Sequence, residues 1–369
     1  MKLLFLNLSP VKFTVETPEQ APLGGSESCC AYLARQLAAN GHDVTLMTHL
    51  PTSKSGTPER LRGVRHLPAD AGTGLFFREE DFDAIITLTS PDNAESLKRA
   101  APRSFHVAWL HLMPPQPVMA GLPRATPFID CAVMVSSYQQ KVLHFGGPSQ
   151  VIGNGMAPPF ENMFGSPEEL RAAKENRAIY ASVPDRGLDV LAAAFPLAKI
   201  ETALDVYSGM NLYQRHQDDM MLAPLYDAVE KLPRTRRHLA VGERELAMAM
   251  KGAAFLAYPC ILGETYCIVA LEAMAAGLKV VSTDAGALPE STLGHADLLP
   301  LAGLDTHALV PRFAAHLEKN VGEFLARPEA WAEERFTQLQ EVNRRCSWQA
   351  RAKEWEAFLG PAVAWKRST

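Results

Sequence analysis

The sequence lacks any long apolar run, and it lacks an excess of basic residues. Its 369 residues contain no apolar stretch of the length, about 18 residues, that crossing a membrane requires. Lys and Arg number 36 against 41 Asp and Glu, a formal net charge of -5. Broad nucleic-acid binding needs a clustered basic surface, so this composition argues against that class of function while leaving room for a small basic patch.

The sequence also lacks cysteine spacings that would build a disulfide framework or a zinc site. Of its 6 cysteines, Cys29 and Cys30 are adjacent and the others are dispersed, with no Cys-x2-Cys or His-x3-His pattern. The apolar start, Met1–Leu8, is interrupted by Asn7 and has no small-residue cleavage site, so it resembles a buried strand more than a signal peptide. We therefore expect reduced thiols and a cytoplasmic location.

What the sequence does contain is a repeated alternation of short apolar runs with longer amphipathic stretches, which predicts βα units and parallel sheets. At 47% hydrophobic and 21% charged residues, the chain can bury a sizeable core. The predicted strands are Leu3–Leu8, Val44–Thr48, Ala84–Leu88, Val107–His111, Ala132–Ser136, Gln150–Ile152, Ala178–Ser182, Ala203–Tyr207, Arg237–Val241, Ala254–Tyr258, Lys279–Thr283 and Asp297–Leu301.

Two domains are expected from the length and from a break in this alternation. Gly153–Gly165 is rich in Gly, Pro and Asn and is the best linker candidate, and Ser166 then begins a helix as its N-cap. We predict an N-terminal domain over 1–160, completed by a helix at about 347–369, and a C-terminal domain over 161–346. The expected fold class is α/β, with two Rossmann-like doubly wound domains facing a central cleft. From Thr306 to Leu359 the chain looks helical.

The most informative segment is Gly263–Gly277. From Tyr266 to Ala276 every residue is apolar except Glu272, which is typical of a helix that is buried on all sides. A buried carboxylate needs a partner, and the hydroxyl groups of a polyol ligand would serve. Glu264 precedes this helix, whose first turn offers backbone N–H groups near Thr265 to an anion. The structural alternative is a buried salt bridge for Glu272 and a helix-dipole partner for Glu264.

These residues resemble a known signature. Glu264 and Glu272, with seven residues between them and Ala-Met-Ala-Ala-Gly following, resemble the Glu-x7-Glu motif of retaining glycosyltransferases with the GT-B fold, most closely glycosyltransferase family 4. The continuation Lys279–Glu290 is also similar to that family. The resemblance extends from Leu23 to Glu290, and Ser347–Trp355 fits the family's closing helices, so it spans nearly the whole chain.

In the N-terminal half, Gly24 and Gly25 resemble the family's glycine loop after the first strand, where backbone N–H groups can approach an anion. A plain turn with Ser26 as N-cap is the alternative. His111 ends a predicted strand where the family keeps a histidine facing the donor sugar; alone, it would be read as a structural histidine. The family often has an acidic residue next, and here Leu112 stands instead.

In the C-terminal half, Tyr180–Leu188 resembles the family's basic phosphate-binding loop, with a departure. The family commonly has an Arg followed four or five residues later by a Lys, whereas this chain has Ser182 and then Arg186. Arg186 can bind a diphosphate through two N–H groups, but one cation is missing. Arg215 is a speculative substitute, and a helix-start surface charge is the structural alternative for Arg186. Val151–Met156 resembles the Asn-Gly crossing between the two domains.

The resemblance implies transfer of a sugar from a nucleotide-diphosphate-sugar donor to a carbohydrate or other hydroxyl acceptor, with retention of configuration. It implies catalytic roles for His111, Arg186 and Glu264. The implied donor-binding residues are Gly24, Gly25, Ser182, Arg186, Glu264, Thr265, Tyr266 and Glu272. In this reading Glu272 binds the ribose and Glu264 the sugar.

The resemblance also implies the nucleotide-sugar as substrate, no cofactor and no essential metal, and we expect Asp218 and Asp219 to be a solvated surface pair. No nucleic-acid partner is expected, and a peripheral contact with a membrane stays open, as do the oligomeric state, the donor and the acceptor. The acceptor is expected against the N-terminal domain, near Pro10–Pro22, Gly72–Arg78 and the Pro-rich run after His111.

Three rival functions use related scaffolds. A nicotinamide dehydrogenase would need Gly-x-Gly-x-x-Gly directly after the first strand, where this chain has Ser9-Pro10. A non-enzymatic two-domain binding protein would be expected to carry an export signal. A nucleotide-sugar epimerase shares the donor and is the main alternative; formation of a transfer product separates it from a glycosyltransferase.

Overall fold

The computed structural model describes residues 1–50, 60–88, 91–113 and 119–369, which form two compact units. Unit 1 comprises Met1–Pro18, Leu23–Gly155 and Trp348–Thr369, and unit 2 comprises Glu19–Pro22 and Met156–Ser347. The chain thus leaves unit 1 after Gly155 and returns to it at Trp348. None of the helices in these described ranges combines the length and apolar character needed to cross a lipid bilayer.

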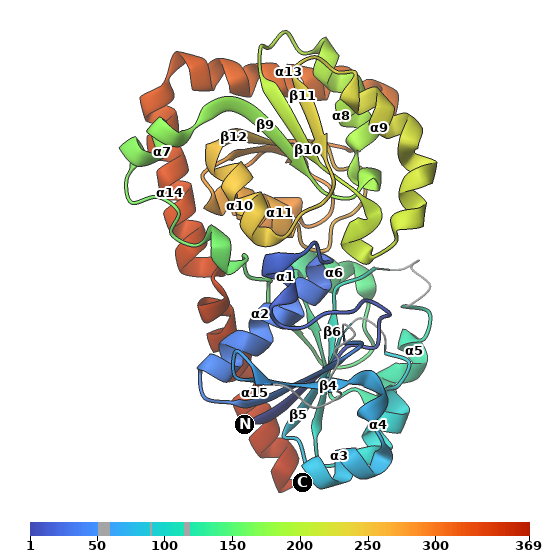
Figure 1. Cartoon of the computed structure of the whole chain (residues 1–369). Helices are drawn as coiled ribbons and strands as arrows, with labels where there is room; N and C mark the ends of the chain where they lie inside the picture. Colours follow the sequence, from blue (N-terminus) through green and yellow to red (C-terminus); the bar gives the residue numbers. More distant parts are fainter. Residues whose placement is uncertain (51–59, 89–90, 114–118) are drawn as a thin grey trace. The chain divides into compact units, whose positions relative to one another are not determined.

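Unit 1 is built on an eight-stranded sheet in the order β3-β4-β2-β1-β5-β6-β7-β8 (Figure 1). Every neighbouring pair is parallel except the antiparallel pair of β3 and β4. The central strands are almost entirely buried because helices cover both faces of a parallel sheet. The strands are β1 (Lys2–Leu6), β2 (Asp43–Thr48), β3 (Arg60–Leu61), β4 (Val64–Pro68), β5 (Ala84–Leu88), β6 (Phe105–Leu110), β7 (Cys131–Met134) and β8 (Ser149–Val151).

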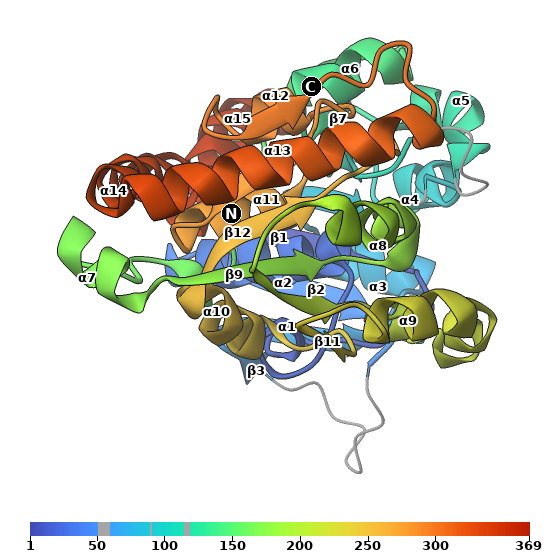
Figure 2. The ribbon, with the colours of Figure 1, turned by 90° about the horizontal axis from the view of Figure 1, so that it is seen from above.

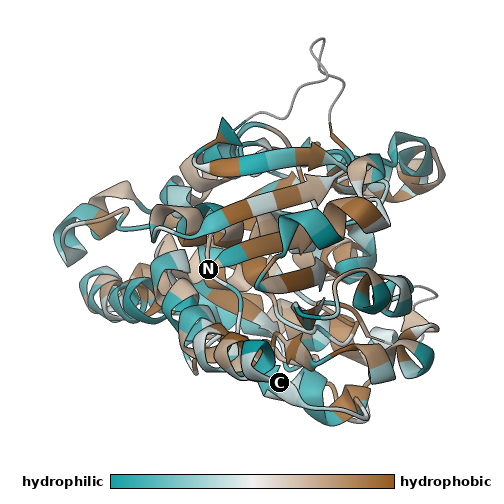
Figure 3. Cartoon of the chain, turned by 90° about the horizontal axis from the view of Figure 1, so that it is seen from below, coloured by the Kyte–Doolittle hydropathy of each residue, from teal (hydrophilic) through white to brown (hydrophobic). Residues whose placement is uncertain are grey.

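The two faces of this sheet carry different helices. On one face α15 packs against α2 and β6, with Trp355 of α15 at 5.1 Å from Trp109 of β6, ring centre to ring centre. On the other face α3, α4 and α5 cover apolar clusters that include Leu4, Ile85 and Leu110. Brown, hydrophobic stretches recur along the strands in Figure 3. The helices are α1 (Thr17–Gln20), α2 (Gly25–Ala39), α3 (Gly74–Glu80), α4 (Ala94–Ala100), α5 (Leu122–Ala125), α6 (Ser137–Leu143) and α15 (Trp348–Ser368).

Unit 2 is built on a six-stranded, wholly parallel sheet in the order β11-β10-β9-β12-β13-β14. Its long helix α13 runs along one side of the sheet and α10 lies on the other (Figure 2). The strands are β9 (Glu175–Ala181), β10 (Ala203–Tyr207), β11 (Thr235–His238), β12 (Ala253–Tyr258), β13 (Lys279–Thr283) and β14 (Asp297–Leu299). The helices are α7 (Pro167–Ala173), α8 (Leu188–Ala194), α9 (Ala223–Glu230), α10 (Glu243–Gly252), α11 (Ile268–Ala275), α12 (Leu288–Ser291), α13 (Thr306–Ala326) and α14 (Pro328–Cys346).

The predicted α/β class with two doubly wound parallel sheets is confirmed. All twelve predicted strands are present within a few residues, and Ser166 is the N-cap of α7, accepting a hydrogen bond from the Glu169 amide at 3.2 Å. The hairpin of β3 and β4 was not predicted, because β4 mixes polar and apolar residues at an edge of the sheet. The C-terminal helical stretch is broken at Arg327 and Ser347 into three helices.

The C-terminal helix supplies a large part of the core of unit 1, which gives a stability prediction. Trp355 is fully buried, and we expect Trp355→Ala to destabilise unit 1 by about 3–5 kcal/mol through the cavity it leaves. Trp365, on the same helix, is 59% exposed, so Trp365→Ala is the matched control, with an expected effect within about 0.5 kcal/mol. Urea denaturation followed by circular dichroism measures both. Equal midpoints for the two variants would contradict this packing role.

Candidate active site

In unit 2 the candidate residues gather where the strand order reverses. From β9 the chain proceeds outward through β10 and β11, then returns to place β12 on the other side of β9. Ligands of open parallel sheets bind beyond the carboxyl ends of the strands at such a switch point. Arg186 follows β9 and Glu264 follows β12, so the two loops that border the switch carry the two predicted charged residues.

These two side chains form an ion pair. Nη1 of Arg186 lies 3.1 Å from Oε2 of Glu264, and their side chains are 25% and 11% exposed. The other carboxylate oxygen, Oε1, accepts a hydrogen bond from the hydroxyl of Tyr258 at 2.6 Å. Glu264 is therefore held from both sides, and it can rotate little without losing a partner.

The charge of Arg186 is secured by its surroundings. Burial alone would lower the pKa of this guanidinium, but neighbouring groups, with Glu264 first among them, raise the pKa above its ordinary value. Arg186 thus stays cationic at any pH at which the protein is folded. Its remaining N–H groups are suited to the oxygens of a phosphate or diphosphate.

The backbone of Glu264 is fixed by Gly286, in the loop after β13. The two residues form a parallel β-bridge, and the amide of Ala287 donates to the Glu264 carbonyl at 2.8 Å. Gly286 has a φ of +64°, and a Cβ there would lie 2.3 Å from the Glu264 carbonyl oxygen. Only glycine satisfies both the left-handed backbone and the close approach.

The second glutamate of the motif, Glu272, is buried in the middle of α11. The helix begins at Ile268, two residues later than predicted, and its residues from Ala270 to Ala275 are all buried. Oε1 of Glu272 accepts a hydrogen bond from the amide of Ala157 at 3.2 Å. Burial, followed by the negative charge of Glu243, raises the pKa of Glu272 well above its ordinary value. Its buried surroundings therefore disfavour the ionised form of this carboxyl group.

Glu243, the first residue of α10, supplies that neighbouring negative charge. Its Oε2 atom is buried and has no hydrogen-bond partner among the described residues. Burial raises the pKa of Glu243 to about 8. Two carboxyl groups with raised pKa values thus influence each other in unit 2.

The other predicted residues of unit 2 lie in loops. Ser182 directly follows β9 and is partly exposed, and Thr265 and Tyr266 precede α11 rather than belonging to its first turn. Arg215, the speculative replacement for the missing cation, forms an exposed ion pair with Asp218.

The expectation that Asp218 and Asp219 form a solvated surface pair is wrong, because both have partners within the protein. Asp218 is paired with Arg215. Oδ1 of Asp219 accepts hydrogen bonds from the Tyr226 hydroxyl at 2.7 Å and from the Met210 amide at 2.8 Å.

In unit 1, His111 directly follows β6 and is buried. Its ring packs on that of Trp109 at 4.6 Å. Burial lowers the pKa of His111 to about 4, against the opposing effect of a hydrogen bond with the Asn154 side chain. The imidazole is therefore neutral near pH 7 and cannot replace the cation that the loop after β9 lacks.

The glycine loop of unit 1 leads directly into α2. Gly24 is the N-cap and Gly25 the first helical residue, and Gly24 has an ordinary φ of -59°. In the first turn of α2, Glu27 accepts hydrogen bonds from Ser9 Oγ at 3.1 Å and Asn7 Nδ2 at 3.4 Å. Part of the Pro-rich run after His111, residues 114–118, lies outside the described residues.

Three polar side chains near these sites were not anticipated: the buried Tyr258 and Glu27, and Glu243, whose Oε2 atom is buried. Tyr258 ends an apolar strand and reads as core in the sequence. Glu243 reads as an exposed charge in the first turn of an amphipathic helix. Glu27 follows the glycine loop directly, and its position at the start of a helix after the first strand is the one signal that could have identified it.

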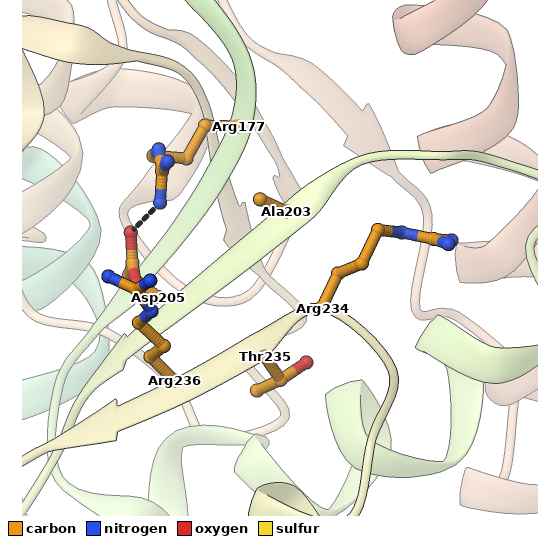
Figure 4. A pocket seen from close by; sticks show the side chains of 6 residues that line it. All are labelled: Arg177, Ala203, Asp205, Arg234, Thr235 and Arg236. Atoms are coloured by element: carbon orange, nitrogen blue, oxygen red, sulfur yellow. Dashed lines mark hydrogen bonds and ion pairs between the residues drawn. The ribbon is translucent and has the colours of Figure 1, made fainter.

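A separate pocket of about 280 Å³ in unit 2 lies away from all the predicted residues. It is at the amino-terminal ends of the strands, since Ala203 begins β10 and Thr235 begins β11. Figure 4 shows Arg177 and Asp205 pointing toward one another, with Nη1 of Arg177 2.6 Å from Oδ2 of Asp205, whereas Arg234 extends away. The charge of Arg177 is already balanced by Asp205. The pocket also lies at the opposite ends of the strands from the candidate site, so it takes no part in that site.

The raised pKa of Glu243 predicts a pH-dependent stability. A carboxyl group that titrates near pH 8 when folded and at 4.5 ordinarily makes the folded state bind more protons between those values, so stability falls as pH rises through this range. The glutamine of Glu243→Gln cannot ionise. Its gain in free energy of unfolding over the wild type, measured by urea denaturation, should therefore be larger at about pH 8.5 than at about pH 5, by about 1 kcal/mol or more. Glu245→Gln, on the exposed surface of the same helix, is the control. A gain for Glu243→Gln that is the same at both pH values would refute the shift.

Comparison with known proteins gives one family match, over a segment of unit 2, and several similar structures. Residues 178–319 match the family described as "Glycosyl transferases group 1". No curated protein sequence is similar enough to match the chain. Among solved structures, sucrose-phosphate synthase from Thermosynechococcus elongatus has a TM-score of 0.71 at 17% identity, covering 99% of this chain and 100% of that chain.

Two further structures are similar over nearly their whole length. Anabaena HepE in complex with UDP and glucose has a TM-score of 0.70 at 14% identity, covering 98% of this chain and 100% of that chain. WaaG, a glycosyltransferase involved in lipopolysaccharide biosynthesis, has a TM-score of 0.63 at 15% identity, covering 97% and 99%. The two parallel-sheet units match the GT-B fold of these structures, and the family match is confined to the segment 178–319.

Proposed function

We propose that this glycosyltransferase moves a sugar from a nucleotide-diphosphate-sugar donor to a hydroxyl group of an acceptor, with retention of configuration and without an essential metal. The observation that carries the proposal is the ion pair of Arg186 and Glu264, 3.1 Å apart at the strand switch of unit 2. Both residues lie within the segment that matches the group 1 family. A carboxylate held beside a permanent cation suits a ligand that joins a sugar to a diphosphate.

In this proposal the diphosphate binds at Arg186, at Ser182 and at the backbone N–H groups near Thr265 and Tyr266. Positive electrostatics at the diphosphate are what the reaction needs, because negative charge develops there as the bond to the sugar breaks. Glu264 accepts hydrogen bonds from hydroxyl groups of the transferred sugar. Its contact with Tyr258 leaves the carboxylate in one orientation, so the sugar is positioned without a further ordering cost.

Glu272 binds the ribose hydroxyl groups of the donor. Burial raises the pKa of its carboxyl group and so favours the protonated form, which can donate to one hydroxyl oxygen and accept from the next. A vicinal diol offers this pairing of donor and acceptor. Glu243, with its buried and unpartnered Oε2, is close enough to influence the charge of Glu272 and adds polarity beside it.

Three residues of unit 1 have proposed roles of their own. Gly24 and Gly25 present backbone N–H groups at the start of α2 to the diphosphate, and His111 orients the donor sugar near its anomeric carbon. His111 acts as a neutral hydrogen-bonding group, since burial lowers its pKa to about 4. The acceptor binds to unit 1.

In the chemical step, the bond between the anomeric carbon and the diphosphate oxygen breaks and its electron pair leaves with the diphosphate. The acceptor oxygen forms the new bond on the same face, and its proton passes to the departing diphosphate oxygen. A covalent thiol intermediate finds no support near Glu264, because burial raises the pKa of Cys260 to about 12 and that of Cys267 well above its ordinary value. This agrees with a front-face reaction.

The proposed role of Glu272 predicts the effect of its removal on donor binding. Titration calorimetry with UDP, the nucleotide bound in the HepE complex, should show at least about tenfold weaker binding for Glu272→Ala, the cost of losing hydrogen bonds from a buried polar group. Glu245→Ala, exposed on α10, is the control and should bind within about twofold of the wild type. Unchanged affinity for a folded Glu272→Ala variant would remove Glu272 from the ribose site.

The stereochemical outcome gives a second prediction. A thermal-shift screen of nucleotide-diphosphate sugars identifies the donor, since a ligand at a hundred times its Kd stabilises by about 2.7 kcal/mol. The anomeric proton coupling of the transfer product, measured by NMR, should then match the configuration of that donor. Inversion would contradict the proposed mechanism, and free epimerised nucleotide-sugar without any transfer product would favour the epimerase.

A further inference from the structure

Unit 1 contains a pocket of about 310 Å³ that no predicted donor residue lines. It lies between the sheet and the helices α3 and α4, which pack side by side on one face (Figure 1). Leu6, the last residue of β1, and Met47, near the end of β2, form its floor, and Asn93 stands before α4 at its edge. The pocket is therefore at the carboxyl ends of the strands.

This position is the strand switch of unit 1. The chain proceeds from β1 through β2 to β4 on one side and then returns to place β5 on the other side of β1. The pocket is lined from both branches, by Met47 and Ala69 on the side of β2 and β4 and by Asn93 after β5. This is where a doubly wound sheet offers a ligand site, and the volume falls within the range of small-molecule pockets, roughly 300–1,000 Å³.

The walls of the pocket are apolar. Met47, Phe77 and Leu97 are buried in the core cluster beneath it, and Leu8 and Ala100 are packed against that cluster while remaining partly exposed. No Lys, Arg, Asp, Glu or His belongs to the described lining. An apolar surface that remains open to water gains free energy when an apolar ligand covers it.

The space depends in part on a missing side chain at Gly72. Its φ is -75°, a value that any residue can adopt, so the backbone does not require glycine there. A Cβ at this position would lie 3.1 Å from Met47 Sδ and 3.3 Å from Phe77 Cζ. Glycine thus leaves open the wall where these two side chains meet.

We infer that this pocket binds the hydrophobic aglycone of the acceptor, an alkyl chain or an aromatic ring attached to its sugar or hydroxyl-bearing part. The inference rests on the proposed function, in which unit 1 binds the acceptor. Apolar walls select the aglycone, and the polar groups at the rim, Asn93 and Ser96, face the hydroxyl-bearing part. A wholly polar oligosaccharide would gain nothing by covering the partly exposed apolar side chains Leu8 and Ala100.

NMR of the full chain with ¹³C-methyl-labelled methionine tests this inference. The probes are methyl, butyl, hexyl and octyl β-glucosides and phenyl β-glucoside, all below micellar concentrations. We expect the Met47 methyl resonance, assigned with Met47→Leu, to shift with increasing alkyl length, with affinity rising about fourfold per buried methylene. Met248 in unit 2, which is 78% exposed, should not respond. A Met47 resonance that ignores every probe, or responds equally to methyl and octyl glucoside, would overturn the inference.

A matched pair of variants on α4 locates the binding. Ser96 lines the pocket, so Ser96→Phe should fill it and weaken octyl glucoside binding at least about tenfold. Glu95 is the adjacent exposed residue, outside the pocket lining, and Glu95→Phe should bind within about twofold of the wild type. Equal affinities of the two folded variants would place the binding elsewhere.

Two further measurements are needed. One distinguishes an alkyl from an aromatic aglycone, and the other distinguishes failure of the apolar subsite from failure of the proposed function. Tighter binding of hexyl than of phenyl glucoside, which carry equal carbon numbers, indicates a lipid-like chain, and the reverse indicates an aromatic aglycone; both support an apolar subsite. UDP binding by calorimetry reports on the donor site alone. Failure of the glucosides with intact binding of UDP or of the donor found in the thermal-shift screen refutes the subsite, whereas the absence of any nucleotide-diphosphate-sugar binder in that screen refutes the proposed function.

Discussion

The ion pair of Arg186 and Glu264 is the constraint on which the candidate site depends. A carboxylate this well buried is unfavourable without compensation, and Arg186 supplies the compensating charge at 3.1 Å. The pairing requires the loops after β9 and β12 to meet, which is possible because these two strands are parallel neighbours in the sheet. Tyr258 and Gly286 then fix the side chain and the backbone of Glu264 separately. The strand arrangement and the ion pair with Arg186 therefore together fix the position of the Glu264 carboxylate.

The second glutamate of the motif is stabilised in a different way. Glu272 accepts one backbone N–H, and its neighbour of like charge, Glu243, raises its pKa further. The surroundings of Glu272 favour its protonated form by raising its pKa, whereas Glu264 is paired with Arg186. One motif thus places two carboxyl groups in different electrostatic environments.

Sequence patterns predicted the strands well because buried parallel strands are nearly continuous apolar runs. They also singled out Glu272, as the one charge in an apolar helix, and Glu264 before it, whereas Arg186 was predicted from the resemblance of its loop to a family motif. They could not identify Tyr258 or Glu243, because one reads as core and the other as surface until the tertiary structure brings them to Glu264 and Glu272. The hairpin of β3 and β4 was missed because edge strands carry mixed residues.

The two units show why topology alone does not determine chemistry. Both sheets reverse their strand order, and both place loop residues at the carboxyl ends next to that reversal. In unit 2 those loops carry a paired Arg and Glu, and in unit 1 they border a pocket whose described lining is uncharged. In our proposals the same sheet topology therefore binds a charged ligand group in unit 2 and an apolar one in unit 1. The difference lies in a few loop residues. One of them is Gly72, which has no side chain to fill the wall of the pocket.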